Sequence, residues 1–153
     1  MSACTVCGAP TSRSVVPESA ATLSGVTVYV APVPVAVCEL GHRQAVPGLV
    51  DELASGIQER VLTATRKGWR REPRCGQCAA PLTMPAYSTE VPVPVALPGG
   101  VVTVTLATRM VRCPDCGRTQ LPVESSAAWR GAVEAAVRFA VEARDGSAQD
   151  DPT

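Results

Sequence analysis

Cys75-Gly76-Gln77-Cys78 and Cys113-Pro114-Asp115-Cys116 are two short cysteine turns in the second half of the chain. The first half has a similar pair, Cys4-Thr5-Val6-Cys7 and Cys38-Glu39-Leu40-Gly41-His42. The four turns together contain all 7 cysteines and the only histidine of the 153 residues. These eight side chains divide into two sets of four donors without remainder, so we expect each half to close around one metal ion.

The donor types and their spacing are typical of structural zinc. Zn²⁺ takes four thiolate or imidazole ligands in a tetrahedron, and two cysteines separated by two residues can both reach one ion. The sequence therefore predicts two structural Zn²⁺ ions. The predicted ligands are Cys4, Cys7, Cys38 and His42 in the first set, and Cys75, Cys78, Cys113 and Cys116 in the second set.

Other interpretations of the cysteines remain open. An odd number of cysteines does not pair completely into disulfides. The segment 1–10 has no charged and apolar signal regions, which favours a reducing cytoplasm. Iron in place of zinc and a cross-braced pairing of the turns are alternatives. If His42 is a surface residue instead of a ligand, the first site keeps an open position, as catalytic zinc does.

The two halves are interpreted as copies of one unit. Pro10 and Pro81 each lie six residues after the first cysteine of their half. Gly25 and Gly100 each lie 13 residues before the second turn. The offset between the copies is 71 residues at the first turn and 75 at the second, so the later copy has about four additional residues between its turns.

Each copy is expected to contain a turn, a β-hairpin, a second turn and a helix. Alternation of apolar and polar residues over 101–106 predicts a half-buried strand. The prolines of the Pro-Val-Pro-Val runs at 32–35 and 92–95 cannot donate ladder hydrogen bonds, which predicts edge strands or extended segments, with polyproline recognition as the alternative. The fold prediction is a small α+β protein with two tandem zinc ribbons, each an antiparallel β-hairpin followed by an amphipathic helix.

This pattern places the units along the chain as follows. Unit 1 spans 1–64 with a helix at about 48–64, and 65–74 is a basic linker. Unit 2 spans 75–144 with a helix at about 125–144 that Ser125 or Ser126 caps, and 145–153 is a disordered tail. We expect each helix to pack on the ribbon of its own unit, with a partner-binding groove as the alternative. The predicted apolar stripes are Val50, Leu53, Ile57 and Val61, and Trp129, Val133, Ala136 and Ala140.

The formal net charge is zero, which argues against a globally basic nucleic-acid binder. A local basic cluster nevertheless surrounds Trp69, and arginines beside an aromatic ring can hold phosphates while the ring stacks on a base. The tentative nucleic-acid contacts are Arg66, Lys67, Trp69, Arg70, Arg71 and Arg74. The alternative is that these cations complement a helix carboxyl end and Trp69 fills the junction between the units. We expect no membrane span, since no apolar run reaches 18 residues.

The first unit resembles the zinc domain of MqsA-type (YgiT-type) antitoxins. The resemblance covers 4–62 and rests on Cys4-x2-Cys7-Gly8, the valine-rich strand after Gly25, and Val33–Cys38 leading into the second turn. It implies a zinc domain that binds a partner toxin. In that family a separate helix-turn-helix domain binds DNA, and we expect none here. This sequence also has His42 where the family has cysteine, and it carries a second zinc unit.

These observations predict a non-enzymatic tandem zinc-ribbon protein, antitoxin-like, that acts as a protein-interaction or adaptor module in the cytoplasm. Its expected partner is a protein, and no small-molecule substrate is expected. If both sites are closed, no histidine remains as a general base and no cysteine as a nucleophile. The alternative function is a nucleic-acid-binding regulator that uses the arginine-rich segment 60–74. A redox switch at the thiolates is a third hypothesis.

Overall fold

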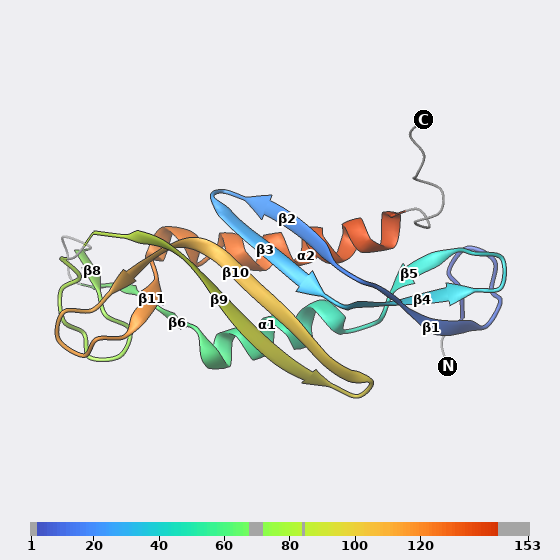
Figure 1. The fold of residues 1–153 in the computed structure, drawn as a ribbon, viewed down its shortest axis with the longest axis horizontal. Coiled ribbons are helices and arrows are strands. Elements are labelled where there is room, and N and C mark those ends of the chain that lie inside the picture. Colours follow the sequence, from blue (N-terminus) through green and yellow to red (C-terminus); the bar gives the residue numbers. More distant parts are fainter. Residues whose placement is uncertain (1–2, 68–71, 84, 144–153) are drawn as a thin grey trace.

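The computed structural model describes residues 3–67, 72–83 and 85–143, and it is a small α+β protein with several antiparallel sheets and two helices. The molecule is elongated (Figure 1). Its helical elements are α1 (Leu49–Arg60), α2 (Ala128–Glu142) and a short 3₁₀ turn, η1 (Val123–Ser125). The strands are β1 (Thr11–Val16), β2 (Ser19–Leu23), β3 (Val26–Ala31), β4 (Val33–Cys38), β5 (Arg43–Ala45), β6 (Leu62–Thr63), β7 (Thr65–Lys67), β8 (Glu72–Arg74), β9 (Tyr87–Leu97), β10 (Gly100–Arg112) and β11 (Thr119–Leu121).

One sheet joins the two halves of the chain. β3 from the first half pairs antiparallel with β10 from the second, with Tyr29 opposite Thr105 and Val30 opposite Val104. Residues 29 and 104, and likewise 30 and 105, differ by the 75-residue offset of the repeat. Each residue therefore pairs with the counterpart of its neighbour, and a pseudo-two-fold axis passes between β3 and β10.

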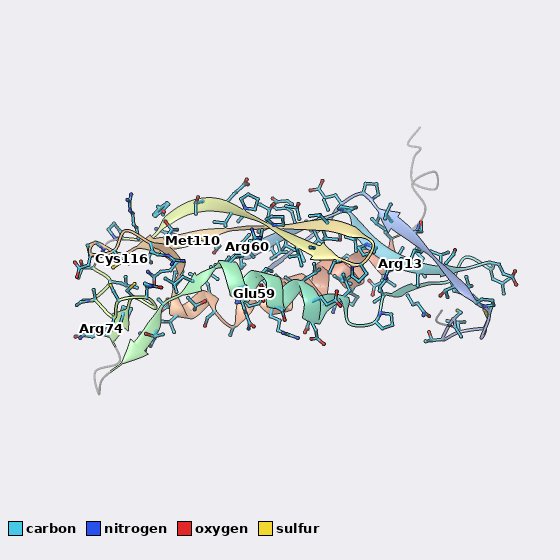
Figure 2. All side chains as sticks on the ribbon, turned by 90° about the horizontal axis from the view of Figure 1, so that it is seen from below. Arg13, Glu59, Arg60, Arg74, Met110 and Cys116 are labelled. Carbon is cyan, nitrogen blue, oxygen red and sulfur yellow. The ribbon has the colours of Figure 1, made fainter. Side chains whose placement is uncertain are left out.

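The helices are exchanged between the halves. α2 packs on β2 and β3, and α1 packs on β9, with both helices on one side of the sheet (Figure 2). The expectation that each helix packs on the ribbon of its own half is wrong. The inward valines of β3 and β10 form one continuous apolar surface because the strands are paired, and both helices cover it. Ranges 1–64 and 75–144 accordingly share one hydrophobic core.

The helix boundaries differ from the expected ones. α1 ends at Arg60 because Val61 is extended and β6 pairs in parallel with β11. α2 begins at Ala128, and no side chain caps it. Capping by Ser125 or Ser126 is thus wrong, since the Ser126 hydroxyl donates instead to the Val123 carbonyl at 2.7 Å. The stripes on the two helices are largely confirmed, with Leu53, Ile57, Trp129, Val133, Ala136 and Ala140 buried.

The two hairpin regions are built differently. In the second half, β9 and β10 form one long antiparallel hairpin. In the first half the equivalent residues divide into two pairings, β2 with β3 and β1 with β4. β9 pairs only with β10 among the described residues, which confirms an edge strand for 92–95. β4 lies between β1 and β5, but β5 pairs only with Val35–Val37, so Val33 and Pro34 have a neighbouring strand on one side only. The edge prediction for 32–35 therefore fails only at Val35.

No helix within the described ranges is both long and apolar enough to cross a membrane.

Candidate metal centres

The structure brings the eight predicted ligands together as two clusters at opposite ends of the molecule. The first lies beyond β4 and β5, and the second lies beside β8 and β11 (Figure 1). In each cluster all four donor atoms lie within 4.8 Å of one another. Figure 2 shows Cys116 and Arg74 at one end, well away from Arg13.

The donor distances fit a tetrahedral ion. Sulfur–metal bonds of about 2.3 Å place two tetrahedral sulfurs about 3.8 Å apart. In the second cluster the Sγ atoms of Cys75 and Cys116 are 3.6 Å apart, as are those of Cys78 and Cys113.

The first cluster fits equally well. Its Cys7 and Cys38 Sγ atoms are separated by 3.8 Å. His42 Nδ1 lies 3.4 Å from Cys38 Sγ, where a mixed nitrogen–sulfur pair is expected at about 3.6 Å. Both clusters can therefore hold one metal ion each.

Three of the four ligand turns close in the same way. The backbone N–H that follows the turn returns to the carbonyl of its first cysteine, as from Gly8 to Cys4 at 2.8 Å and from Gly117 to Cys113 at 3.0 Å. Gly8 and Gly117 have φ of 75° and 76°, a left-handed conformation that glycine adopts without a Cβ penalty. The third turn has Ala79 at this position, with φ of 63°.

A buried glutamine supports the second cluster. Gln120 is fully buried, and its Nε2 donates to Cys75 Sγ at 3.2 Å. Its Oε1 accepts the Gly76 N–H at 2.8 Å, so one side chain fixes both the turn and a sulfur. Such contacts orient ligands and tune a metal site.

Gln44 occupies the same place in the first half. It lies opposite Ala36, two residues before Cys38, as Gln120 lies opposite Val111, two residues before Cys113. Gln44 Oε1 accepts the Thr5 N–H at 2.9 Å. The sequence reasoning missed both glutamines. The available signal was a glutamine shortly after each second turn.

Hydrogen bonds to sulfur set the protonation of the thiols. The backbone N–H of Cys7, followed by that of Val6, lowers the pKa of Cys4 to about 6. Burial raises the pKa of Cys75, but the Cys78 N–H and the Gln120 amide outweigh it and lower the value to about 6. Each cluster thus contains one thiol that readily becomes the thiolate a metal requires.

The pKa of Cys78, whose sulfur lies close to the other three sulfurs of the second cluster, shifts in the opposite direction. The Ala80 backbone lowers the pKa of Cys78, but burial and the neighbouring sulfurs together raise it to about 12. Closely spaced sulfurs resist carrying several negative charges at once. A divalent cation at the centre relieves that repulsion, so the donor set suits such an ion.

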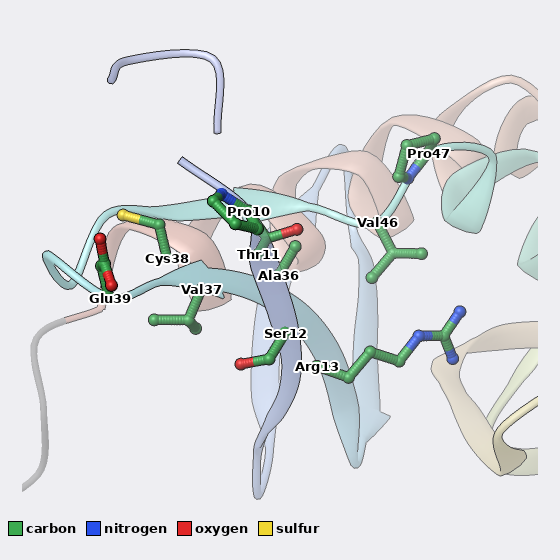
Figure 3. Close-up of a pocket in the computed structure, with 10 residues that line it drawn as sticks. All are labelled: Pro10, Thr11, Ser12, Arg13, Ala36, Val37, Cys38, Glu39, Val46 and Pro47. Carbon is green, nitrogen blue, oxygen red and sulfur yellow. The ribbon is translucent and has the colours of Figure 1, made fainter. Parts of the chain in front are cut away.

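The outer tips of the clusters differ in polarity. Val6 and Leu40, at the third position of their turns, are 70% and 67% exposed. The second cluster has Gln77 and Asp115 at those positions. An open hollow of about 700 Å³ lies beside the first cluster, between Cys38 and Val46–Pro47 (Figure 3). The first end of the molecule is therefore the more apolar one.

The basic segment is only partly described. The Arg66 side chain pairs with Glu124, and Arg74 lies 3.9 Å from Glu72. Lys67 ends β7, which pairs with β8. Trp69, Arg70 and Arg71 lie outside the described residues, so the predicted stacking arrangement around Trp69 stays a prediction.

Comparison with protein-family models, curated proteins and solved structures finds no match.

Proposed function

We propose that the protein is a non-enzymatic tandem zinc-ribbon protein that acts as a cytoplasmic protein-interaction module, antitoxin-like in its use of a zinc domain to hold a partner. In this proposal each cluster holds one structural Zn²⁺, and each ribbon is followed in the chain by an amphipathic helix. The donor sets use all seven thiols and the single imidazole, which supports closed sites.

One observation carries the proposal of partner binding. Val6 and Leu40 are the most exposed large apolar side chains of the described residues, and both stand at the tips of the first cluster. The fold does not require them, because the second cluster has the polar Gln77 and Asp115 at the matching positions. Apolar side chains concentrated at one exposed end are typical of a protein contact.

Zinc content tests the cofactor part of the proposal. The purified protein should contain two zinc ions per chain by elemental analysis, and Cys78→Ser should lower this to about one. Retention of two ions in that variant, or iron in place of zinc, would contradict the assignment.

Capture of a partner tests the binding part. The tagged holoprotein is used to bind proteins from native lysate, with and without nuclease, alongside the double variant Val6→Asp, Leu40→Asp. Gln77→Asp is the matched control because it adds a charge at the other tip. We expect a protein that survives nuclease and binds the control but not the double variant.

The same experiment separates the nucleic-acid alternative. In that case capture is lost on nuclease treatment and is unaffected by the tip variants. Binding then also weakens with salt, and Arg70→Ala with Arg71→Ala reduces the salt dependence. The ion pairs of Arg66 and Arg74 with nearby glutamates give this alternative less support than partner binding.

A further inference from the structure

A second hollow lies between the end of α1 and the second cluster. Its volume is about 440 Å³, within the range of small-ligand pockets. α1 contributes its last turn, and the cysteine turns of the second cluster and the residues after them contribute Gln77 and Arg118. α2 contributes Trp129 from its first turn. The apolar part of the lining consists of Ile57, Val61, Leu62, Leu121 and Trp129.

Two arginines of this hollow have no partner for their charge. The side chains of Arg60 and Arg118 form no ion pair or hydrogen bond with any described residue, whereas the other arginines of this region, such as Arg66, are paired with carboxylates. Glu59 is the only acidic residue of the lining. It precedes Arg60 in α1 (Figure 2), so the two side chains point about 100° apart around the helix. Two cations against one acid leave the hollow with a net positive charge.

Trp129 adds a hydrogen-bond donor that also lacks a partner. Its side chain is 5% exposed, and its indole N–H donates to no atom of the described residues. Buried indole N–H groups usually have an acceptor. Among the described residues, Thr65 Oγ1 is the only fully enclosed side-chain N or O atom without a partner, so the Trp129 nitrogen is accessible, and it is accessible from the hollow that Trp129 lines. An acceptor bound there would satisfy it.

The two helix ends at the hollow act in opposite directions. α1 ends here, and the negative end of its dipole offsets part of the charge of Arg60. α2 begins here, no side chain caps its N-terminus, and the positive end of its dipole favours an anion. Arg118 belongs to neither helix. Its charge is therefore the least compensated one at the hollow.

We propose that this hollow binds a small organic oxyanion, which has an apolar body and a terminal carboxylate or phosphate. The three groups without a partner are all donors, and guanidinium groups in particular hold the oxygens of carboxylate and phosphate. The apolar lining accommodates the body of the ligand, which a bare inorganic ion lacks. The hollow lies at the end of the molecule opposite Val6 and Leu40, so the proposal does not rest on partner binding there.

Titration with two aromatic anions tests the proposal. The zinc-loaded full chain with Trp69→Phe keeps Trp129 as its only tryptophan, so one indole N–H signal remains in NMR spectra. Benzoate and phenyl phosphate are compared with benzyl alcohol, which has a similar body and no charge. At least one anion should shift the indole signal saturably, with a dissociation constant of about 0.1–5 mM, and the alcohol should not. The tighter anion identifies the oxyanion. No saturable shift with either anion, or an equal shift with the alcohol, would overturn the proposal.

Removal of single charges locates the site. Arg118→Gln should weaken binding of the tighter anion by about tenfold or more, and Arg60→Gln should weaken it less because α1 offsets that charge. Arg138→Gln is the matched control, since it removes the same charge from an exposed position of α2 outside the hollow, and it should leave the affinity unchanged. The zinc content of each variant reports whether the second cluster is intact. Equal weakening by all three variants would indicate non-specific attraction and overturn the proposal.

Discussion

At the scale of single residues, Gln120 connects Cys75, a proposed metal ligand, to the β-ladder. Replacing it in Gln120→Leu removes the amide donor to Cys75 Sγ and leaves the Gly76 N–H without its acceptor. Loss of such a supporting contact typically weakens metal binding by about 10–100-fold. We expect that loss at the second site alone, measured by competition with a chromogenic chelator. Gln44→Leu is the matched control, and it should affect only the first site, and less, because the Gln44 amide hydrogen-bonds to the backbone of Thr5 and Ala3. Equal weakening of both sites by Gln120→Leu would contradict this role.

Ala79 carries strain that glycine avoids at the equivalent positions. Its φ of 63° brings Cβ close to the following carbonyl, at a cost of about 1–2 kcal/mol. Ala79→Gly should therefore raise the free energy of unfolding of the zinc-loaded protein by about 0.5–1 kcal/mol, after allowing for the greater freedom of unfolded glycine. Gly117→Ala is the reverse change and should lower it by a similar amount. At Gly117 an added Cβ would meet only the Arg112 side chain, at an ordinary 3.6 Å. Chemical denaturation decides, and a destabilised Ala79→Gly would contradict the strain argument.

At the scale of elements, two glycines set how closely the exchanged helices approach the sheet. Gly56 in α1 and Gly131 in α2 differ by the 75-residue offset of the repeat. An added Cβ at Gly56 would lie 2.6 Å from a methyl of Val95, which is stiff and only 7% exposed. At Gly131 it would meet only the end of the Leu23 side chain, which is 43% exposed and can turn away.

The two glycines therefore predict opposite outcomes for one substitution. Alanine favours a helix interior by about 1 kcal/mol over glycine, whereas overpacking costs about 1–3 kcal/mol. Gly56→Ala should lower the melting temperature, and Gly131→Ala should raise it or leave it unchanged. Shifts of the same sign and size in calorimetry would show that packing against Val95 is not limiting.

The sequence predicts the helices and strands better than it predicts which of them pack against one another. Ligand spacing predicts which thiols gather, and apolar periodicity identifies the buried sides of Leu53 and Val133, because both signals are local. The choice of surface that each helix covers is not local. The two hairpins carry nearly the same valine pattern, so periodicity cannot tell whether α1 covers the first or the second. That choice follows from the pairing of β3 with β10. The role of Gln120 could not be predicted for a similar reason, because Gln120 and the Cys75 that it contacts are 45 residues apart in the sequence.

At the scale of the whole molecule, the chain is built like a dimer with exchanged helices whose two copies are joined covalently. β3–β10 pairing and the crossing of α1 to β9 and of α2 to β2 hold the halves together.

The connection through 68–71 should therefore be dispensable once both halves are present. If a protease site replaces this segment, the cleaved zinc-loaded halves should still elute together as a 1:1 complex in light scattering. Expressed alone, the first half should pair with itself through β3, because antiparallel β3 strands can meet in the same register about the same axis. Elution of two separately folded monomers after cleavage would contradict this architecture, and Thr105→Pro in the cleaved protein should weaken the complex by removing a ladder hydrogen bond between β10 and β3.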